Sequence, residues 1–453
     1  MIADIGDTMK VKILLFFIII TTFPVFSKNV LPRDSLYVSR AQKLEKEGDK
    51  KEAVKLYKKA IIENPYNIVA NHALAFFYFN RHEYEAALCY FQMLYKLVSE
   101  TAAAYYLGYV LYQLGRYNEA LVYIEEAVKR GLTNDVVYKS LRDIYFTLGK
   151  LDKSYEYNDA FVDIVSKDPK KSLDNLWRGE DVAGKIILLR SDIGIGDAFQ
   201  WMRYARFFKQ RGATVIAAVR PTLLPIVSLC SWIDKVVDRN KILPYFDFQV
   251  PTSLLPFVIK PTFEDIKGLS CVSYLRADKA LVKKWEKILV KDQRYKIGIC
   301  WDPCHYYSSG VFLKNKRAIP LYDFYALSKV EGVSLYSLQQ YNGMEQIPLM
   351  SSDFTMHTFD KDFDKKYGGF MDTAAVMKNL DLVITVDTSI AHLAGALGIE
   401  VWVMVPYVSS FRWFLDWGHS PWYPTMRLFR QSKVGDWQSV IDRICEELLS
   451  LTG

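Results

Sequence analysis

Cysteine is scarce and scattered in this sequence, which argues against a zinc site and against a disulfide framework. Cys300 and Cys304 are the one close pair among six cysteines, and neither a second pair nor a histidine lies at ligand spacing. We therefore expect free thiols. Long hydrophobic runs are scarce as well. The apolar run at residues 13–26 is shorter than the ~20 residues that cross a bilayer.

A strong charge of either sign is also missing. The 58 basic and 51 acidic residues leave a formal net charge of +7, and no basic stripe with interleaved aromatics stands out, so nucleic acid is not expected as a partner. The mild excess suits anionic ligands such as nucleotides. Because 51% of the residues are hydrophobic and 15% aromatic, we expect a folded chain. Its 453 residues predict about three domains.

The amino terminus, residues 1–33, reads as a signal-like or anchor segment followed by a linker. Met9, Lys10 and Lys12 precede the apolar run, and residues 25–27 resemble a signal-peptidase site. A secretory signal is the first interpretation. An uncleaved anchor, which would associate residues 10–27 with a membrane, is the second, and a buried first helix is the third.

Residues 34–170 contain about four copies of a repeat. Gly48, Gly115 and Gly149 stand at turn positions that lie two periods and one period of ~34 residues apart. This spacing resembles the tetratricopeptide repeat, whose stacked helix pairs expose a concave groove for a protein or peptide. A simple spacer is the alternative. The fourth copy is degenerate, because Arg142 and Ser154 stand where small residues belong.

A different pattern begins in residues 171–292. Residues 186–189 predict a buried strand, and residues 191–197 form a glycine-containing turn that leads into a helix over 198–210. Gly194 and Gly196 permit close approach of the backbone to a ligand, and Asp197 stands at the start of the helix, facing the crevice. An aspartate at this position, taken alone, is more often a helix cap than a base.

The same strand–turn–helix pattern recurs in residues 293–453. Residues 382–386 predict a buried strand, and Asp387, Thr388 and Ser389 supply cap groups for a helix that Gly398 closes. A helix starting at the carboxyl end of a parallel strand directs free N–H groups into the crevice, which suits a diphosphate. An ordinary capped helix is the alternative. His392, one turn beyond Thr388, is either a ligand contact or a core residue.

Further elements surround this turn. Residues 297–301 and 333–338 predict strands, with Gln339 at the tip of the second, and residues 278–290 predict a charged amphipathic helix that connects the two halves. Lys314, Lys316 and Arg317 lie on a loop that leads from a strand end, where they could clamp phosphate oxygens. A solvated basic loop is the alternative.

Six segments together carry a family resemblance: residues 177–180, 194–205, 317–321, 337–339, 386–398 and 421–431. They resemble bacterial tetratricopeptide-repeat proteins with a carboxy-terminal glycosyltransferase domain of the ADP-heptose:lipopolysaccharide heptosyltransferase type, which is family 9-like. The resemblance implies a helical tetratricopeptide-repeat solenoid followed by an α/β GT-B fold, two Rossmann-like domains facing a cleft. The architecture is also similar to protein O-linked N-acetylglucosamine transferases. Ser191, Asp192 and Asp302 depart from the family pattern and leave the substrate open.

The resemblance also implies roles for single residues. It makes Asp197 the general base. It assigns nucleotide-sugar binding to Gly194, Gly196, Trp301, Lys316, Arg317, Gln339, Asp387, Thr388, Ser389 and His392. The implied activity is a metal-independent, inverting transfer of a sugar to a hydroxyl of a glycan or protein that the repeats recruit. The nucleotide sugar is a substrate, and no cofactor or metal is expected.

The alternative is a non-catalytic interaction protein with a degenerate GT-B domain. The signal-like start favours it, because activated nucleotide sugars are cytosolic and an exported enzyme would lack its donor. The location therefore stays open between export, a membrane anchor and, for an active enzyme, the cytoplasm or the cytoplasmic face of the inner membrane.

Overall fold

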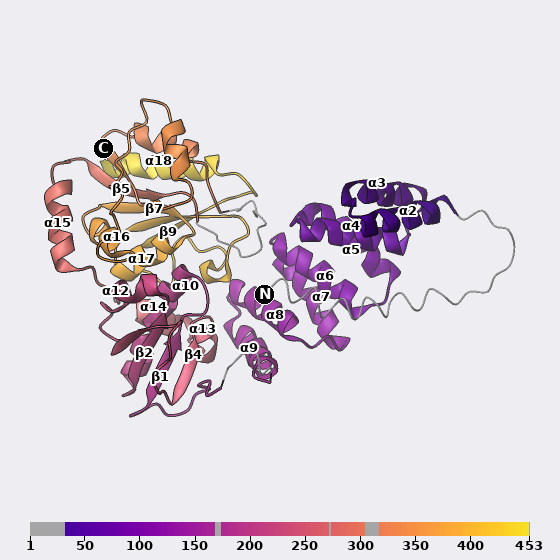
Figure 1. Cartoon of the computed structure of the whole chain (residues 1–453), viewed down its shortest axis with the longest axis horizontal. Coiled ribbons are helices and arrows are strands. Elements are labelled where there is room, and N and C mark those ends of the chain that lie inside the picture. Colours follow the sequence, from indigo (N-terminus) through magenta and orange to yellow (C-terminus); the bar gives the residue numbers. More distant parts are fainter. Residues whose placement is uncertain (1–31, 168–173, 271–272, 304–316, 453) are drawn as a thin grey trace. The chain divides into compact units, whose positions relative to one another are not determined.

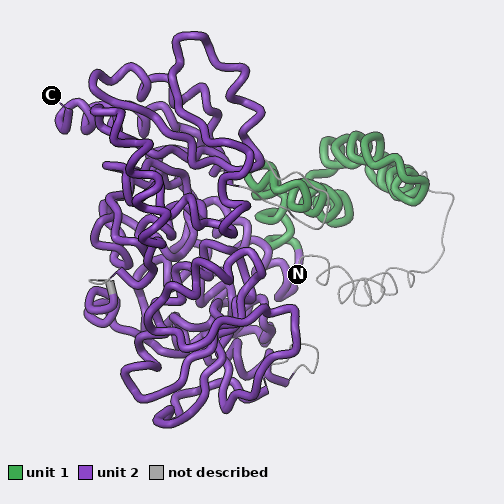
Figure 2. The backbone as a smooth tube through the Cα atoms, turned by 60° about the vertical axis from the view of Figure 1, so that its left-hand side comes forward, with its two compact units in different colours: residues 1–97 green, residues 98–453 purple. Residues whose placement is uncertain are grey.

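The computed structural model describes residues 32–167, 174–270, 273–303 and 317–452 (Figure 1). The interpretations of residues 10–27 and the predicted site residue Lys316 lie outside the described residues. Among the described residues, no helix combines the length and the apolarity needed to span a membrane. The chain divides into two compact units, residues 1–97 and 98–453 (Figure 2).

The first unit is built from two helix pairs. Helix α2 (Arg33–Glu47) packs on α3 (Lys50–Glu63), and α4 (Ile68–Asn80) packs on α5 (Tyr84–Leu97). Alanines such as Ala41 and Ala53 are fully buried where the helices cross, so the backbones approach closely. Helix α2 ends at Gly48, whose φ of 91° lies in the left-handed region that favours glycine.

The second unit opens with two more helix pairs. Helices α6 (Thr101–Gln113) and α7 (Tyr117–Lys129) form one pair, and α8 (Asp135–Thr147) and α9 (Leu151–Val165) form the other. A Cβ atom on Gly108 would meet Ile124 Cγ1 at 2.6 Å, so only glycine allows α6 to approach α7 this closely. Over the described residues from 33 to 165 the chain thus forms eight helices in four pairs, and the predicted helical repeat is confirmed.

The fourth pair departs from the repeat pattern because it packs against the α/β half of its own unit. The Arg142 guanidinium carbon lies 4.1 Å from the centre of the Phe257 ring, and Ser154 donates a hydrogen bond of 2.9 Å to the Arg142 carbonyl. Arg142 therefore contributes to the interface with the α/β half, whereas Ser154 joins α9 to α8 within the pair. The predicted domain boundary near residue 170 stays a prediction, and the division between compact units falls earlier, at residue 97.

The first α/β lobe carries a four-stranded parallel sheet in the order β3-β2-β1-β4. Its strands are β1 (Ile186–Arg190), β2 (Thr214–Val219), β3 (Lys235–Asp238) and β4 (Phe248–Pro251). The chain moves from β1 outward to β3 and then returns to the other side of β1. The point between β1 and β4 is therefore the topological switch point, where such sheets leave a crevice at their carboxyl edge.

The second lobe carries a five-stranded parallel sheet in the order β6-β5-β7-β8-β9. Its strands are β5 (Tyr295–Cys300), β6 (Val333–Ser337), β7 (Leu382–Val386), β8 (Val401–Val405) and β9 (Met426–Arg430). Its switch point lies between β5 and β7, beside the Asp387 turn. Two parallel α/β lobes following a helical repeat is the predicted GT-B architecture, which is confirmed.

Short helices cover both sheets. They are α10 (Ile195–Trp201), η2 (Met202–Tyr204), α11 (Ala205–Lys209), η3 (Pro221–Leu223), α12 (Leu224–Val227), α13 (Leu255–Val258), α14 (Phe263–Ser270), α15 (Lys279–Leu289), η4 (Leu321–Lys329), η5 (Met344–Leu349), α16 (Met371–Met377), α17 (Ser389–Leu397), η6 (Phe411–Trp413) and α18 (Gln438–Thr452). One hydrophobic core runs through both lobes, from Trp201 in α10 to Leu393 in α17. The lobes are thus packed together, with α10, which follows β1, in contact with α17, which follows β7.

Candidate active site

The predicted strand, turn and helix at residues 382–398 are present as β7 and α17. Thr388 caps the helix, because its hydroxyl accepts a hydrogen bond of 3.2 Å from the Ile390 amide. Gly398 ends the helix with a φ of 71°. The amino end of α17 lies at the carboxyl edge of the second sheet, where its N–H groups favour an anion.

Asp387 is buried directly beneath this helix end and is paired with a cation. Its carboxylate lies 3.2 Å from the Arg317 guanidinium, which also donates to the Asp387 carbonyl at 3.3 Å. Burial alone would raise the pKa of Asp387, but the charges of Arg317 and Arg412 outweigh it and hold that pKa below its ordinary value. Asp387 therefore stays ionised and orients Arg317 beside the helix end.

Asp197 reaches the same place from the first lobe. It lies in the first turn of α10 and forms an ion pair with Arg412 of η6, a residue 215 positions further along the chain. Both side chains are largely buried, with 17% and 12% of their surfaces exposed. The predicted base therefore faces the second lobe, and in this state its partner is an arginine that the sequence did not single out.

The two predicted glycines make this approach of the lobes possible. A Cβ atom on Gly196 would meet His392 Cδ2 at 2.8 Å and Ser389 Cα at 3.4 Å. A Cβ atom on Gly194 would meet the Asp197 carboxylate at 2.9 Å. Gly196 therefore lets α10 lie against α17, and Gly194 leaves room for the carboxylate.

His392 is enclosed between the lobes. Its ring stacks on Trp413 with centroids 5.2 Å apart, Nδ1 lies 3.2 Å from the Tyr423 hydroxyl, and Nε2 is buried with no partner among the described residues. Burial, with the nearby Arg412 charge, lowers the pKa of His392 to about 3. The imidazole is thus neutral at physiological pH and packed like a core residue. Its Nε2 has no hydrogen-bond partner among the described residues.

The depressed pKa of His392 predicts a loss of stability in mild acid. An unfolded histidine takes up a proton below pH ~6.5, whereas folded His392 does so only near pH 3. Its contribution is therefore complete above pH 6.5 and falls as the pH drops toward 3. We expect the wild-type protein to lose about 2 kcal/mol more unfolding free energy between pH 7.5 and pH 5.0 than His392→Gln. Urea unfolding at both pH values measures this, and equal losses would contradict it.

Gln339 and Trp301 hold the second lobe's loops. The Gln339 carboxamide oxygen accepts from the Trp301 and Asp302 amides at 3.0 Å, and its nitrogen donates to the Asp302 and Asn342 carbonyls. Trp301 is fully buried in the core of the lobe. Every hydrogen bond described for Gln339 is thus made within the protein, so its side chain joins the loops that follow β5 and β6.

A pocket of about 480 Å³ opens at the carboxyl edge of the second sheet. Its lining residues follow β5, β6, β8 and β9 and include none of the residues that the sequence singled out as binding a nucleotide sugar. They are Asp302, Ala318, Ile319, Pro320, Gln346, Pro406, Tyr407, Val408, Gln431, Val434, Gly435 and Trp437. The described lining contains neither Lys nor Arg, so Arg317, which is predicted to bind phosphate, lies outside it.

Two carboxamides give this pocket its polar character. Gln431 accepts from the Tyr407 amide at 3.1 Å, which leaves its nitrogen buried without a partner among the described residues. Gln346 accepts from the Leu321 amide at 2.7 Å. Burial, with the charge of Glu345, raises the pKa of Asp302. Apolar walls, amide donors and one carboxylate suit a flat heteroaromatic group with both acceptors and donors.

Sequence reasoning missed Arg412 and Arg203. Arg203 is fully buried, donates to the Gln200 carbonyl at 2.8 Å and to the Trp422 carbonyl, and lies 4.3 Å from the centre of the Tyr423 ring. It thereby ties the first lobe to the second behind α10. Arg203 lies in residues 194–205, one of the segments that carry the family resemblance, and that was its available signal; Arg412 lies in none of those segments.

Comparison with known proteins bears on both parts of the chain. No family model matches it. Protein FlbA of Caulobacter vibrioides is 23% identical over 425 residues, which cover 88% of this chain and 70% of FlbA. Among solved structures, YrrB, described as a TPR protein with an unusual peptide-binding site, covers 28% of this chain and is itself covered to 66%, with 21% identity and a TM-score of 0.26.

Two solved glycosyltransferases are similar over the α/β half. A family 9 glycosyl transferase from Veillonella parvula is 12% identical, covers 61% of this chain and is covered to 100%, with a TM-score of 0.43. The ADP-heptose LPS heptosyltransferase II of E. coli is 14% identical, covers 59% of this chain and is covered to 98%, with a TM-score of 0.41. The two parts are thus similar to a tetratricopeptide-repeat protein and to family 9 glycosyltransferases.

Proposed function

We propose that this chain is a glycosyltransferase that moves a sugar from a nucleotide-sugar donor to a hydroxyl group of a glycan or protein acceptor. The observation that carries the proposal is the placement of Asp197 from one lobe against the amino end of α17 in the other. A carboxylate and an anion-binding helix end on opposite lobes are the two groups that such a transfer needs.

The reaction is a single displacement. Asp197 takes the proton of the acceptor hydroxyl, whose oxygen forms a bond to the anomeric carbon of the sugar. The bond from that carbon to the diphosphate oxygen breaks, and the diphosphate leaves with the electron pair. Attack from the face opposite the leaving group inverts the configuration. Arg317, Arg412 and the α17 amides meet the charge of the departing diphosphate without calling on a metal ion.

Arg412 links donor binding to the base. It is paired with Asp197, and its charge also acts on Asp387 beneath the helix end. A diphosphate bound at α17 competes for this guanidinium, because phosphate oxygens accept bidentate hydrogen bonds from arginine. Donor binding thereby releases the Asp197 carboxylate for its role as base. The pocket beside α17 then takes the nucleobase, which its carboxamides orient.

A second candidate is a non-catalytic interaction protein, and one observation favours it. The ion pair of Asp197 with Arg412 and the close packing of Gly196 on His392 occupy the space between the lobes at this point. In that case the helix pairs alone provide the function by binding a protein or peptide. In the enzyme, the same pairs recruit the acceptor.

Calorimetric titration with ADP, UDP, GDP and CDP, each beside its nucleoside, separates the two candidates. We expect one of these diphosphates to bind. Arg317→Gln should weaken the affinity for that diphosphate about 10- to 100-fold, the value of a charge-assisted hydrogen bond, and leave the affinity for the nucleoside unchanged. Gln431→Leu should weaken the affinities for the diphosphate and for the nucleoside. Arg427→Gln, which removes an arginine paired with Glu447 away from the pocket, is the matched control. Absence of binding by all four diphosphates would favour the interaction protein.

A further inference from the structure

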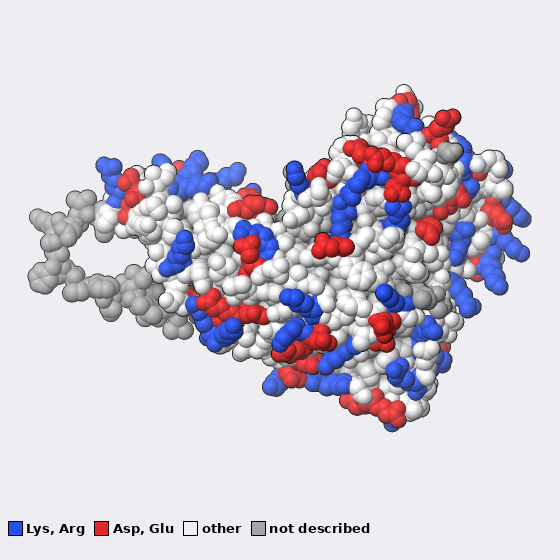
Figure 3. Space-filling view, turned by 180° about the vertical axis from the view of Figure 1, so that it is seen from behind, with Lys and Arg blue, Asp and Glu red and all other residues white. Residues whose placement is uncertain are grey.

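Helix α15 presents a strongly basic face to solvent. Leu281, Trp285 and Leu289 are buried, and the helix packs on α16. The opposite side and the adjoining turns carry the exposed basic residues Arg276, Lys279, Lys283, Lys284, Lys287, Lys291 and Arg294. Glu286 is the one exposed acidic residue in the described part of residues 276–294. Figure 3 shows Lys and Arg gathered along its right-hand edge, the side that carries α15.

The loop beside α15 extends this face. The Phe359 and Phe363 rings pack on Trp285 with centroids 5.1 and 5.5 Å away, which places residues 360–367 next to the helix. This loop adds the exposed residues Lys361, Lys365 and Lys366 together with two acids, Asp360 and Asp362. The exposed residues of 276–294 and 359–367 are called the basic surface below.

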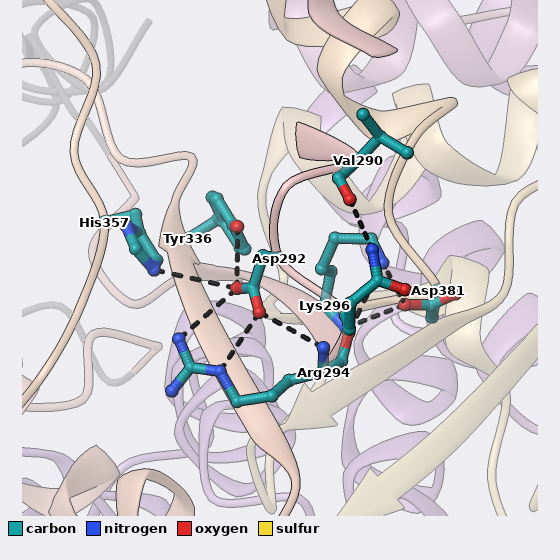
Figure 4. A network of polar contacts seen from close by, with 8 residues as sticks. Val290, Asp292, Arg294, Lys296, Tyr336, His357 and Asp381 are labelled. Carbon is teal, nitrogen blue, oxygen red and sulfur yellow. Dashed lines mark hydrogen bonds and ion pairs between the residues drawn. The ribbon is translucent and has the colours of Figure 1, made fainter. Parts of the chain in front are cut away.

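The acids closest to α15 are already paired. Asp372 is buried and accepts from the Trp285 indole at 2.8 Å, with Lys284 at 3.4 Å. Asp292 accepts from the Tyr336 hydroxyl at 2.9 Å and pairs with Arg294 at 3.0 Å (Figure 4). Burial opposes ionisation of Asp292, but these hydrogen bonds keep its pKa well below the ordinary value. The remaining lysines of α15 thus present their charge to an external anion.

A recess and exposed aliphatic side chains lie within the basic surface. The recess has a volume of about 590 Å³, with Lys284, Lys291 and Arg294 among its lining residues. Ile288 and Val290 at the end of α15 expose 50% and 57% of their surfaces. Tyr367 is an exposed aromatic residue of the basic surface, at 38%, but Lys284 and Lys366 lie over its ring, 5.2 and 5.3 Å from the ring centre. Aliphatic side chains cannot stack on bases as the aromatic platforms of nucleic-acid-binding proteins do. Lysines beside exposed aliphatics are instead the composition of surfaces that lie on lipid headgroups.

We propose that the basic surface docks on a membrane that contains anionic phospholipids. The lysines of α15 contact the headgroup phosphates, Ile288 and Val290 enter the boundary with the acyl chains, and the recess receives a headgroup. Each Lys near an anionic membrane adds about 1 kcal/mol of attraction, and salt weakens that attraction. This binding is independent of residues 10–27 and of the sugar-transfer site, and it would bring the α/β half to a lipid surface.

Sedimentation of the full chain with vesicles tests this docking. We expect tighter binding to vesicles of phosphatidylcholine and phosphatidylglycerol at 70:30 than to phosphatidylcholine alone. Lys283→Gln, Lys287→Gln and Lys291→Gln together should lower the affinity for the anionic vesicles about 10- to 100-fold. The matched control changes the exposed α3 lysines Lys50, Lys51 and Lys59 to Gln and should stay within twofold of the wild type.

Two outcomes overturn the proposal. One is equal binding of the wild-type chain to both kinds of vesicle, and the other is unchanged binding by the α15 triple variant. Binding through residues 10–27 would not depend on these lysines, so it cannot imitate the expected result. A 20-base-pair DNA duplex is the competing probe. If the triple variant loses affinity for DNA while the wild type ignores anionic vesicles, the surface binds nucleic acid and the membrane is excluded as its partner.

Discussion

Replacing Asp197 by asparagine is expected to lower kcat for sugar transfer by about 10²- to 10⁴-fold, the range that a general base contributes. Asparagine keeps the size of the side chain and retains an oxygen that accepts from Arg412, so the packing of α10 against α17 should survive. It cannot take the proton of the acceptor hydroxyl. Initial rates with the donor identified by calorimetry, measured across acceptor concentrations, give the loss in kcat separately from KM.

The control for Asp197→Asn is Asp238→Asn. Asp238 ends the edge strand β3 of the same sheet, and its carboxylate accepts from the Asn240 amide within its own turn. We expect this variant to keep wild-type activity. A rate for Asp197→Asn within a few-fold of the wild type would exclude Asp197 as the base. Asp192, which accepts hydrogen bonds from Thr252 and Ser253 at the neighbouring strand end, would then be the next candidate.

The local elements of the site could be predicted because their signals are local. Strand β7, the Thr388 cap and the Gly398 ending lie in one continuous stretch and follow from strand propensity, capping and left-handed geometry. Strands β8 and β9 escaped prediction. The run of residues 401–405 is fully buried and short, so it carries no periodicity that separates a strand from other buried segments.

Some helices differ from the sequence prediction because of how their residues pack. The helix predicted over residues 198–210 is broken by the 3₁₀ turn η2, which contains the buried Arg203. Residues 321–329 form the 3₁₀ helix η4, whose Leu321, Phe324 and Leu327 pack in the second lobe's own core. The charged amphipathic helix predicted over residues 278–290 is present as α15, but it was interpreted as a connector and not as a binding surface.

The partners of the site residues could not be predicted, since they join distant parts of the chain. The Asp197–Arg412 pair spans 215 residues, and the Arg317–Asp387 pair spans 70. A sequence shows which residues can carry charge but not which charges neutralise each other on burial. Arg142 is a second example. Its place at a repeat position indicates a degenerate copy, and the sequence does not show that its partner is Phe257.

Phe146 of α8 is the point where the helix pairs of the second unit hold the α/β lobes, and its truncation should be costly. The side chain is fully buried, and its ring centre lies 5.2 Å from Phe257 of the first lobe and 5.3 Å from both Phe411 and Phe414 of the second. Removing a buried ring from such a cluster leaves a cavity, so Phe146→Ala should lower the free energy of unfolding by about 3–5 kcal/mol. Val122→Ala on the exposed side of α7 should cost less than about 0.5 kcal/mol.

Urea unfolding followed by tryptophan fluorescence measures this difference, since the Trp417 and Trp422 rings pack on the same cluster. Equal free energies of unfolding for Phe146→Ala and Val122→Ala would show that packing of the helix pairs on the lobes contributes little to stability. A second measurement shows whether Phe146 only stabilises the fold or also affects donor binding. Phe411 is adjacent to Arg412, so loosening it should free Arg412 from Asp197 and change donor affinity in protein that is still folded. If that affinity is unchanged, the helix pairs stabilise the enzyme without reaching its site.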